Sequence, residues 1–223
     1  MANGEGDGAA FRDRGQAGRL LGVALNDHRG QGVLVLGIPR GGVVAAAEVA
    51  RALGAELGVV VARKLGAPDQ PTLAVGAVSA DGTLVLDEAR IRARRIPWSH
   101  LAAAERRERA KARRWQRRYR RGLPPPRMAR RTVIVVDDGL TTGATMRAAL
   151  RSVRQHRPAR LIAAVPVGSA AACAELADEA DEVLCLEKRA NVVAVGACYA
   201  DPTPVDDAEI VRLLDEAAHR PAA

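Results

Sequence analysis

The chain has 223 residues, of which 48% are hydrophobic but only 2% aromatic, so its core must be built from Val, Leu, Ile and Ala. This length suits one domain with elaborations, and no apolar run approaches the ~18 residues that a membrane-spanning helix requires. The net charge of +8 is uneven: residues 89–131 hold 17 basic and 2 acidic side chains, and the remainder is net acidic. Three cysteines (Cys173, Cys185 and Cys198) lack metal-ligand spacing. Their odd number, without an export signal, leads us to expect reduced thiols in the cytoplasm.

The first part of the chain has the pattern of a leader, a helix and a βαβ unit. Residues 1–10 are Gly-rich and acidic, so we expect a disordered leader. Apolar side chains recur at helical spacing over residues 11–25. Residues 33–38 and 57–62 are apolar runs typical of buried strands, and the helix expected between them, 43–53, ends at a glycine. A helical crossover of this kind implies parallel strands.

The α/β alternation breaks between residues 65 and 131. Residues 72–78 and 83–86 have the pattern of short strands around a turn, which predicts a β-hairpin. Residues 99–121 are expected to form a helix that is rich in arginine and carries only a thin apolar stripe. The alternation then resumes with these expected elements: strand 132–136, helix 143–156, strand 160–166, helix 169–178, strands 182–187 and 192–199, and helix 206–218.

This order of elements predicts a doubly wound α/β domain with a mainly parallel sheet. In such a sheet ligands bind at the carboxyl ends of the strands. Three predicted strand ends carry unusual polar groups: Pro39–Gly42, Arg63-Lys64 and Asp137–Thr145. All three belong to the same edge of a parallel sheet, so we expect them to converge on one site. Taken alone, the basic residues could equally be solvated strand ends.

The stretch from Thr132 to Leu150 has the pattern of a phosphate-binding device. A β-branched strand is followed by two carboxylates, Asp137 and Asp138, and then by a Gly/Thr-rich turn that leads into a helix. Free backbone N–H groups and the positive end of the helix dipole bind phosphate, while the acids can accept hydrogen bonds from a sugar diol or hold a cation. A plain strand-to-helix turn with a capping acid is the alternative. The stretch is neither a Walker A loop nor a G-x-G-x-x-G fingerprint.

The same residues carry a family resemblance. VIVVDDGLTTGAT, residues 133–145, resembles the phosphoribosyl pyrophosphate-binding motif of type I phosphoribosyltransferases, with every defined position filled. With GIPRGG, RKLGAP and LAVGAV, it resembles a bacterial branch of predicted phosphoribosyltransferases whose acceptor is undefined. The resemblance extends from about Leu20 to Tyr199. It implies a type I phosphoribosyltransferase-like fold: a five-stranded, mainly parallel sheet with a hood, an inserted hairpin and a basic helix.

The resemblance also implies roles for individual residues. Asp137 and Asp138 would bind the ribose hydroxyls and support the positive charge that develops on the sugar as pyrophosphate leaves. The loop after them would hold the 5-phosphate through Gly139, Leu140, Thr141, Thr142, Gly143, Ala144 and Thr145. Two earlier strand ends would hold pyrophosphate through Arg40, Gly41, Gly42, Arg63 and Lys64. The family often has a non-proline cis peptide in this pyrophosphate loop, and Gly41 is its expected place.

An organisation and partners are implied as well. Residues 11–223 would be a single domain, with 65–131 as an inserted flexible hairpin and Arg-rich helix, and with a hood built from 11–30 and 187–223. Residues 65–88 occupy the position of a lid that keeps water from the reaction. Mg2+ is the implied cofactor, held mainly by the substrate rather than directly by the protein. The implied partners are phosphoribosyl pyrophosphate, a small-molecule acceptor and a second copy of the chain, in a cytoplasmic homodimer with no membrane contact.

The implied function is transfer of 5-phosphoribosyl from Mg-bound phosphoribosyl pyrophosphate to a nitrogenous acceptor, nucleobases among the candidates, with release of pyrophosphate. Val192 and Val193 stand where a ring that stacks on a purine would be expected, which puts a purine in doubt. The alternative function is a regulator that senses phosphoribosyl pyrophosphate without turnover or binds RNA. A sugar-phosphate hydrolase or phosphorylase is a third. For helix 99–121 we favour docking on the sheet or on a partner subunit, with nonspecific anion or RNA binding as the alternative. Only Trp115 and Tyr119 could stack on bases, which argues against sequence-specific readout.

Overall fold

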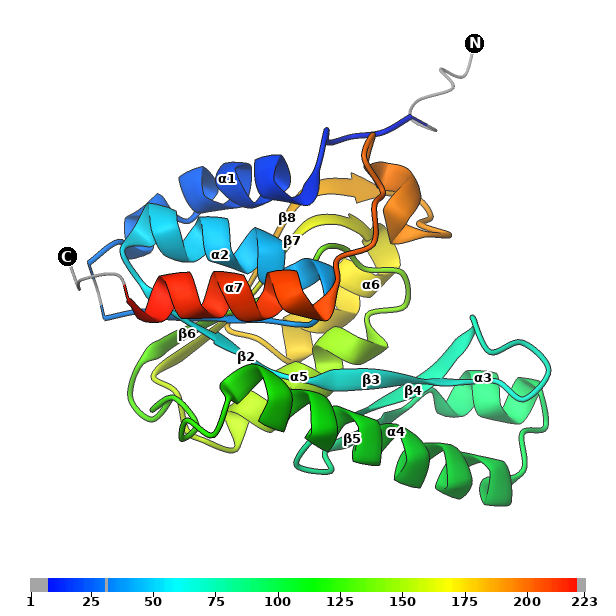
Figure 1. Cartoon of the computed structure of the whole chain (residues 1–223). Coiled ribbons are helices and arrows are strands. Elements are labelled where there is room, and N and C mark those ends of the chain that lie inside the picture. The colour runs from blue at the N-terminus through cyan, green and yellow to red at the C-terminus, as the bar shows by residue number, and fades with distance from the viewer. Residues whose placement is uncertain (1–7, 31, 220–223) are drawn as a thin grey trace, which may run out of the picture.

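Five parallel strands form the central sheet of the computed structural model, which describes residues 8–30 and 32–219 (Figure 1). Their spatial order is β2-β1-β6-β7-β8, so the chain runs outward from β1 to β2 and then resumes on the other side of β1. The strands span Leu34–Gly37 (β1), Glu56–Val59 (β2), Thr132–Val136 (β6), Arg160–Ser169 (β7) and Glu182–Arg189 (β8). The predicted five-stranded, mainly parallel sheet is therefore confirmed. Of the expected leader, residues 1–10, the first seven residues lie outside the described part of the chain.

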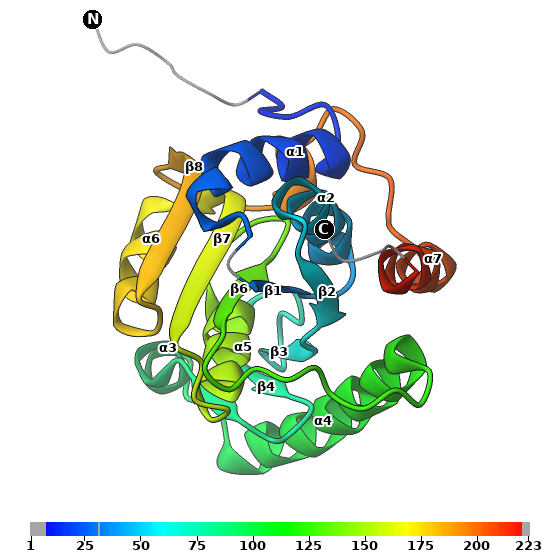
Figure 2. The same cartoon turned by 90° about the vertical axis from the view of Figure 1, so that its left-hand side faces the viewer.

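Helices cover both faces of this sheet (Figure 2). One face carries α1 (Arg14–Ala24) and α2 (Gly41–Leu53), and the other carries α5 (Ala144–Arg154) and α6 (Ala170–Glu175). Successive residues of β6 alternate between these layers because side chains on a strand point to opposite faces. Val135 packs in one core cluster with residues of α5, and Ile134 packs in the other with residues of α1 and α2. Each fully buried side chain of this size stabilises the fold by about 1.5–3 kcal/mol.

A second, antiparallel sheet has the order β3-β4-β5, with β3 at Ala62–Gly66, β4 at Ala74–Ser79 and β5 at Leu84–Leu86. The predicted hairpin is confirmed as β4 and β5, but the strand predicted over 57–62 is wrong at its end. The chain leaves the central sheet after Val59. The Val60 amide still donates to Gly37 O at 3.2 Å, whereas Val61 O accepts from the Ala80 amide at 3.0 Å. As an edge strand β2 has one neighbour only, and its continuation pairs with the hairpin instead.

The hairpin packs against α5 and does not stand free of the domain. Every residue of β4 is buried. At the turn, Ser152 Oγ of α5 donates to Asp81 Oδ2 at 2.5 Å, and Gln155 Nε2 donates to Thr83 Oγ1 at 2.8 Å. These contacts attach the turn of the hairpin to α5.

The Arg-rich helix is α4, Trp98–Arg120, close to the predicted bounds of 99–121. Its thin apolar stripe packs on β3 and β4 and buries Leu101, Ala104, Glu108, Ala112 and Tyr119. A short helix before it, α3 at Glu88–Ala93, was not predicted. The last helix is α7, Asp207–Ala218, and short 3-10 turns lie at Asn26–His28, Leu176–Asp178 and Val195–Cys198. Among the described residues no helix is both long and apolar enough to cross a membrane.

The strand predicted over residues 192–199 is wrong. These residues form an irregular segment with a 3-10 turn, and Val193 is 87% exposed. Their backbone groups pair with the N-terminal segment instead: the Ala10 and Phe11 amides both donate to Cys198 O, and Phe11 forms an isolated bridge with Tyr199. The apolar run therefore folds over the end of the sheet beside α1, the place assigned to a hood.

Candidate active site

Of the two acids that follow β6, Asp138 is held by residues from α1 and from the segment after β8. Arg14, the first residue of α1, donates from Nε to Asp138 Oδ2 at 2.7 Å. Tyr199 Oη donates to the backbone oxygen of Asp138 at 2.6 Å, and the Arg14 guanidinium lies 5.0 Å from the centre of the Tyr199 ring. The Asp138 amide donates to Asp137 Oδ1 at 2.9 Å. Sequence reasoning missed Arg14 and Tyr199.

The acids do not share one electrostatic state. Burial, and next the negative charge of Asp138, raise the pKa of Asp137 well above that of an ordinary aspartate. Burial, followed by the same neighbouring charge, also raises the pKa of Tyr199, so its hydroxyl remains a donor. One acid is therefore driven toward its neutral form beside another that is paired with arginine.

The predicted pyrophosphate loop lies directly against the acid pair. A Cβ atom at Gly41 would overlap the carboxylate of Asp138, and one at Gly42 would lie 2.8 Å from Val136 O. Only glycine allows α2 to begin this close to the end of β6. The cis peptide bond of this loop joins Pro39 to Arg40, one position before the place expected from the resemblance.

The predicted 5-phosphate loop connects the acids to the N-terminus of α5. Gly143 has φ +71° and precedes the first helical residue, Ala144. The loop is fixed to β7, because the Leu140 amide donates to Val167 O at 2.9 Å and Ser169 Oγ donates to Thr141 O at 3.0 Å. The amides of the first turn of α5 lack carbonyl partners within the helix and are available to an anion.

Of the three basic residues, the structure brings two together. The guanidinium carbons of Arg40 and Arg63 lie 5.1 Å and 4.3 Å from the centre of the Trp115 ring. Lys64 points to the opposite face of β3, where its Nζ lies 3.4 Å from Thr72 O. Arg63 and Lys64 both lie within β3, which belongs to the second sheet. The expectation that they end a strand of the parallel sheet is therefore wrong. Strand alternation then separates the two side chains.

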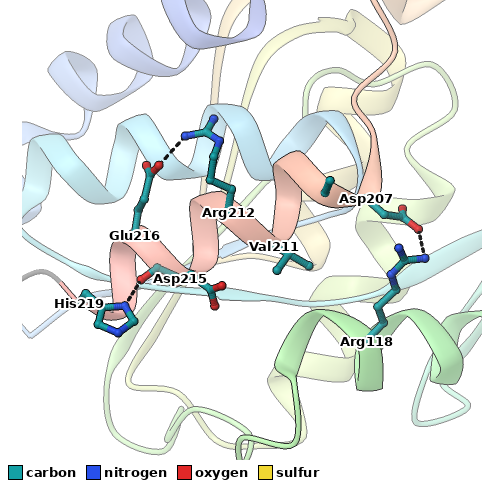
Figure 3. A pocket seen from close by; sticks show the side chains of 8 residues that line it. Arg118, Asp207, Val211, Arg212, Asp215, Glu216 and His219 are labelled. Carbon is teal, nitrogen blue, oxygen red and sulfur yellow. Dashed lines mark hydrogen bonds and ion pairs between the residues drawn. The ribbon is translucent and has the colours of Figure 1, made fainter.

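A surface hollow between α4 and α7 lies outside this set of residues (Figure 3). Four of its charged side chains form two ion pairs: Arg118 Nη1 lies 2.6 Å from Asp207 Oδ2, and Arg212 Nη1 lies 2.5 Å from Glu216 Oε1. The hollow meets the predicted site through Asp207, which also lies 3.5 Å from Arg40 Nε.

Comparison with known proteins identifies a family model, curated relatives and solved structures that resemble this chain. The model of the phosphoribosyl transferase domain family matches residues 15–202. Two relatives from Mycobacterium tuberculosis, strains CDC 1551 / Oshkosh and H37Rv, are provisionally named phosphoribosyl transferases. Each is 43% identical over 210 residues, which cover 94% of this chain and 47% of the relative. The chain thus spans about half the length of these curated relatives. The crystal structure of TT1426 from Thermus thermophilus matches with TM-score 0.75 and 45% identity, over 92% of this chain and 98% of that one.

Proposed function

This chain belongs to the phosphoribosyl transferase domain family, and on that premise we propose that it transfers 5-phosphoribosyl from Mg-bound phosphoribosyl pyrophosphate to a nitrogenous acceptor, releasing pyrophosphate. The observation that carries the proposal is the contact of the Gly41-Gly42 loop with Asp137 and Asp138, next to the loop that begins α5. The proposed substrate is a sugar that carries a phosphate and a diphosphate. The two loops would bind these two anionic groups, and the two acids between them would bind the sugar hydroxyls.

The acids would take the ribose hydroxyls. Asp138 accepts hydrogen bonds, and a protonated Asp137 can also donate one. As the C1–O bond breaks, positive charge grows on the sugar ring, and a carboxylate held nearby stabilises it more than it stabilises the ground state. The bound substrate must share Asp138 with Arg14 or displace that arginine, so the hood can respond to substrate binding.

The departing diphosphate would lie at the N-terminus of α2, where the first-turn N–H groups of Gly41 and Gly42 have no carbonyl partner within the helix. Arg40 and Arg63 would supply positive charge. When bound, Mg2+ would neutralise part of the negative charge on the diphosphate as it leaves. The site fits such an ion only as a partner of the substrate. Asp137 and Asp138 offer oxygen ligands, and no cluster of three or more His, Cys, Asp or Glu suited to a metal occurs among residues 8–30 and 32–219.

A regulator that senses phosphoribosyl pyrophosphate without turnover is the second candidate. It is favoured by the Arg14–Asp138 ion pair, which occupies a group that turnover requires, and by the exposed arginines of α4. Docking of α4 on the second sheet accounts for its apolar stripe, and Arg118 and Arg121 pair with acids of α7. A homodimer, a cytoplasmic location and a lid within residues 65–88 remain predictions.

The deciding experiment measures pyrophosphate release from phosphoribosyl pyrophosphate and Mg2+ over a panel of purines, pyrimidines and small amines. We expect turnover with one class of acceptor and its loss in Asp138→Asn. Asp215→Asn, a half-exposed aspartate of α7, is the matched control and should keep full activity. Binding of phosphoribosyl pyrophosphate without turnover on any acceptor would favour the regulator.

A further inference from the structure

Trp115 joins three segments of the chain that lie far apart in sequence. It is on α4, and its ring is approached by Arg40 from the loop before α2 and by Arg63 from β3. Stacking on an aromatic ring uses the flat face of a guanidinium and leaves its N–H edges free for an anion. The two guanidinium carbons cannot be farther apart than the sum of their distances to the ring centre, a span that one diphosphate can bridge.

Two carboxylates complete the cluster. Glu108 of α4 is only 7% exposed and accepts from Arg63 Nε at 2.7 Å. Although its burial acts in the opposite direction, hydrogen bonds from Arg63 and Lys111 lower the pKa of Glu108 to about 2. On the other side Asp207 lies 3.5 Å from Arg40 Nε and accepts from Tyr119 Oη at 2.7 Å. Arg63 is thus held firmly, while Arg40, with 43% of its side chain exposed, can turn toward a ligand.

We propose that Trp115 is a positioning residue for the diphosphate: its ring gathers Arg40 and Arg63 at one place and makes α4 part of the substrate site. The inference rests on the proposed function, because it assigns the cluster to the diphosphate of that substrate. Arg40 connects the cluster to the acid pair, since it directly precedes Gly41, which contacts Asp138. The basic helix then serves the same anion as the glycine loop.

A purely structural role would make Trp115 an apolar contact that docks α4. The two roles differ in what can replace the ring. Leucine keeps an apolar contact but has no π face, whereas phenylalanine keeps the π face with less surface. Packing alone predicts that both replacements affect stability and neither affects anion binding. Positioning predicts weaker diphosphate binding for Trp115→Leu and recovery in Trp115→Phe.

Fluorescence offers a direct test, because the chain has two tryptophans and the other, Trp98, is 69% exposed at the opposite end of α4. In Trp98→Phe all tryptophan emission comes from Trp115. We expect titration with magnesium pyrophosphate, and separately with phosphoribosyl pyrophosphate, to change that emission in a saturable way. The matched variant Trp115→Phe, which keeps only Trp98, should show no change. If the fluorescence of Trp115 does not change at saturating ligand, the inference is overturned.

Binding and kinetics provide the second test. We expect Trp115→Leu to weaken magnesium pyrophosphate binding in calorimetry about tenfold, the scale of two cation–π contacts. Trp115→Phe should restore it to within about threefold, and Trp98→Leu should match the parent. In turnover assays the loss should appear in the KM for phosphoribosyl pyrophosphate with kcat nearly unchanged. Unchanged affinity in a folded Trp115→Leu protein contradicts the proposal, and if that variant does not fold, the Trp98→Phe titration decides.

The outcomes separate this inference from the proposed function. A saturable Trp115 response without turnover on any acceptor supports the positioning role and removes the transferase. Turnover without a change in Trp115 fluorescence supports the transferase and contradicts the positioning role.

Discussion

The two regions that we propose to bind anions are built in different ways. The acid pair and the 5-phosphate loop, residues 137–145, come from one continuous stretch between β6 and α5. The Trp115 cluster is assembled from the loop before α2, from β3, from α4 and from α7. The first has its chemistry fixed by neighbours in sequence, whereas the second exists only when four distant elements are folded together. Substitutions at contacts between the regions should therefore have larger effects than substitutions within either.

The largest effect is expected at Gly41, where the two regions meet. Gly41→Ala places a methyl group on the Asp138 carboxylate and on Arg14, so the α2 loop or the acids must move. A displacement of about 1 Å in a site of this kind costs about 100-fold, and we expect kcat/KM to fall by at least that factor. Gly196→Ala is the control, because its added Cβ would come no closer than 3.8 Å to another residue. Activity of Gly41→Ala within about twofold of the parent would show that the loop and acids do not act together.

The next effect concerns stability and pH at the acid pair. Because the folded-state pKa of Asp137 is raised, its stabilising contribution is complete below about pH 4 and is lost as the pH rises through the folded pKa. Asp137→Asn has no proton to lose and can still accept from the Asp138 amide. The stability of Asp137→Asn relative to the parent should therefore increase from pH 5 to pH 8.5. The gain in free energy of unfolding is about 1.4 kcal/mol for each pH unit crossed below the raised pKa. The same variant should lose transfer activity.

Thermal melting at several pH values checks this prediction. Asp215→Asn at the surface of α7 should show a difference from the parent that does not vary with pH in this way. The same melting difference for Asp137→Asn at pH 5 and pH 8.5 would mean that Asp137 carries its charge in the folded protein.

A paired comparison tests which basic residues belong to the Trp115 cluster. Arg63→Ala removes a guanidinium that contacts Trp115 and Glu108, whereas Lys64→Ala removes an exposed ammonium on the other face of β3. We expect the KM for phosphoribosyl pyrophosphate to rise about tenfold in Arg63→Ala and by less than about twofold in Lys64→Ala. Equal effects would place Lys64 at the substrate as well.

The smallest effect is expected at Gly143, within the continuous region. Its φ of +71° is costly for any residue with a side chain, although an added Cβ would have ordinary contacts at 3.5 Å and beyond. Gly143→Ala should therefore lower the free energy of unfolding by about 1–2 kcal/mol, as measured in urea. Ala172→Gly in the neighbouring helix tests whether loosening that contact relieves the loss. A loss above about 4 kcal/mol would show that the loop is more tightly packed than the contact distances indicate.

How far the sequence predicts this fold depends on whether an element is decided locally. The apolar run 133–136, the acids after it and the glycine-bearing turns predicted β6, the α5 loop and α2 correctly. The apolar stripe of residues 99–121 predicted α4. The strand predicted over residues 57–62 was wrong at its end, and the strand predicted over 192–199 was wrong. A β-branched apolar run fits either a strand of a sheet or an irregular segment that packs over its end. Whether such a run becomes a strand depends on which backbone groups are available to form hydrogen bonds with it.

By itself, the sequence determined the contiguous half of the site, because strand, acids, loop and helix N-terminus are neighbours along the chain and their geometry follows from bonding and capping. Only the tertiary structure decided which cations join it. Strand alternation separated Lys64 from Arg63, and packing of α4 on the second sheet placed Trp115 between two distant arginines. Pairing of the N-terminal segment with residues 198–201 then brought Arg14 and Tyr199 to Asp138. Contacts of this kind depend on the path of the whole chain, and no local pattern encodes them.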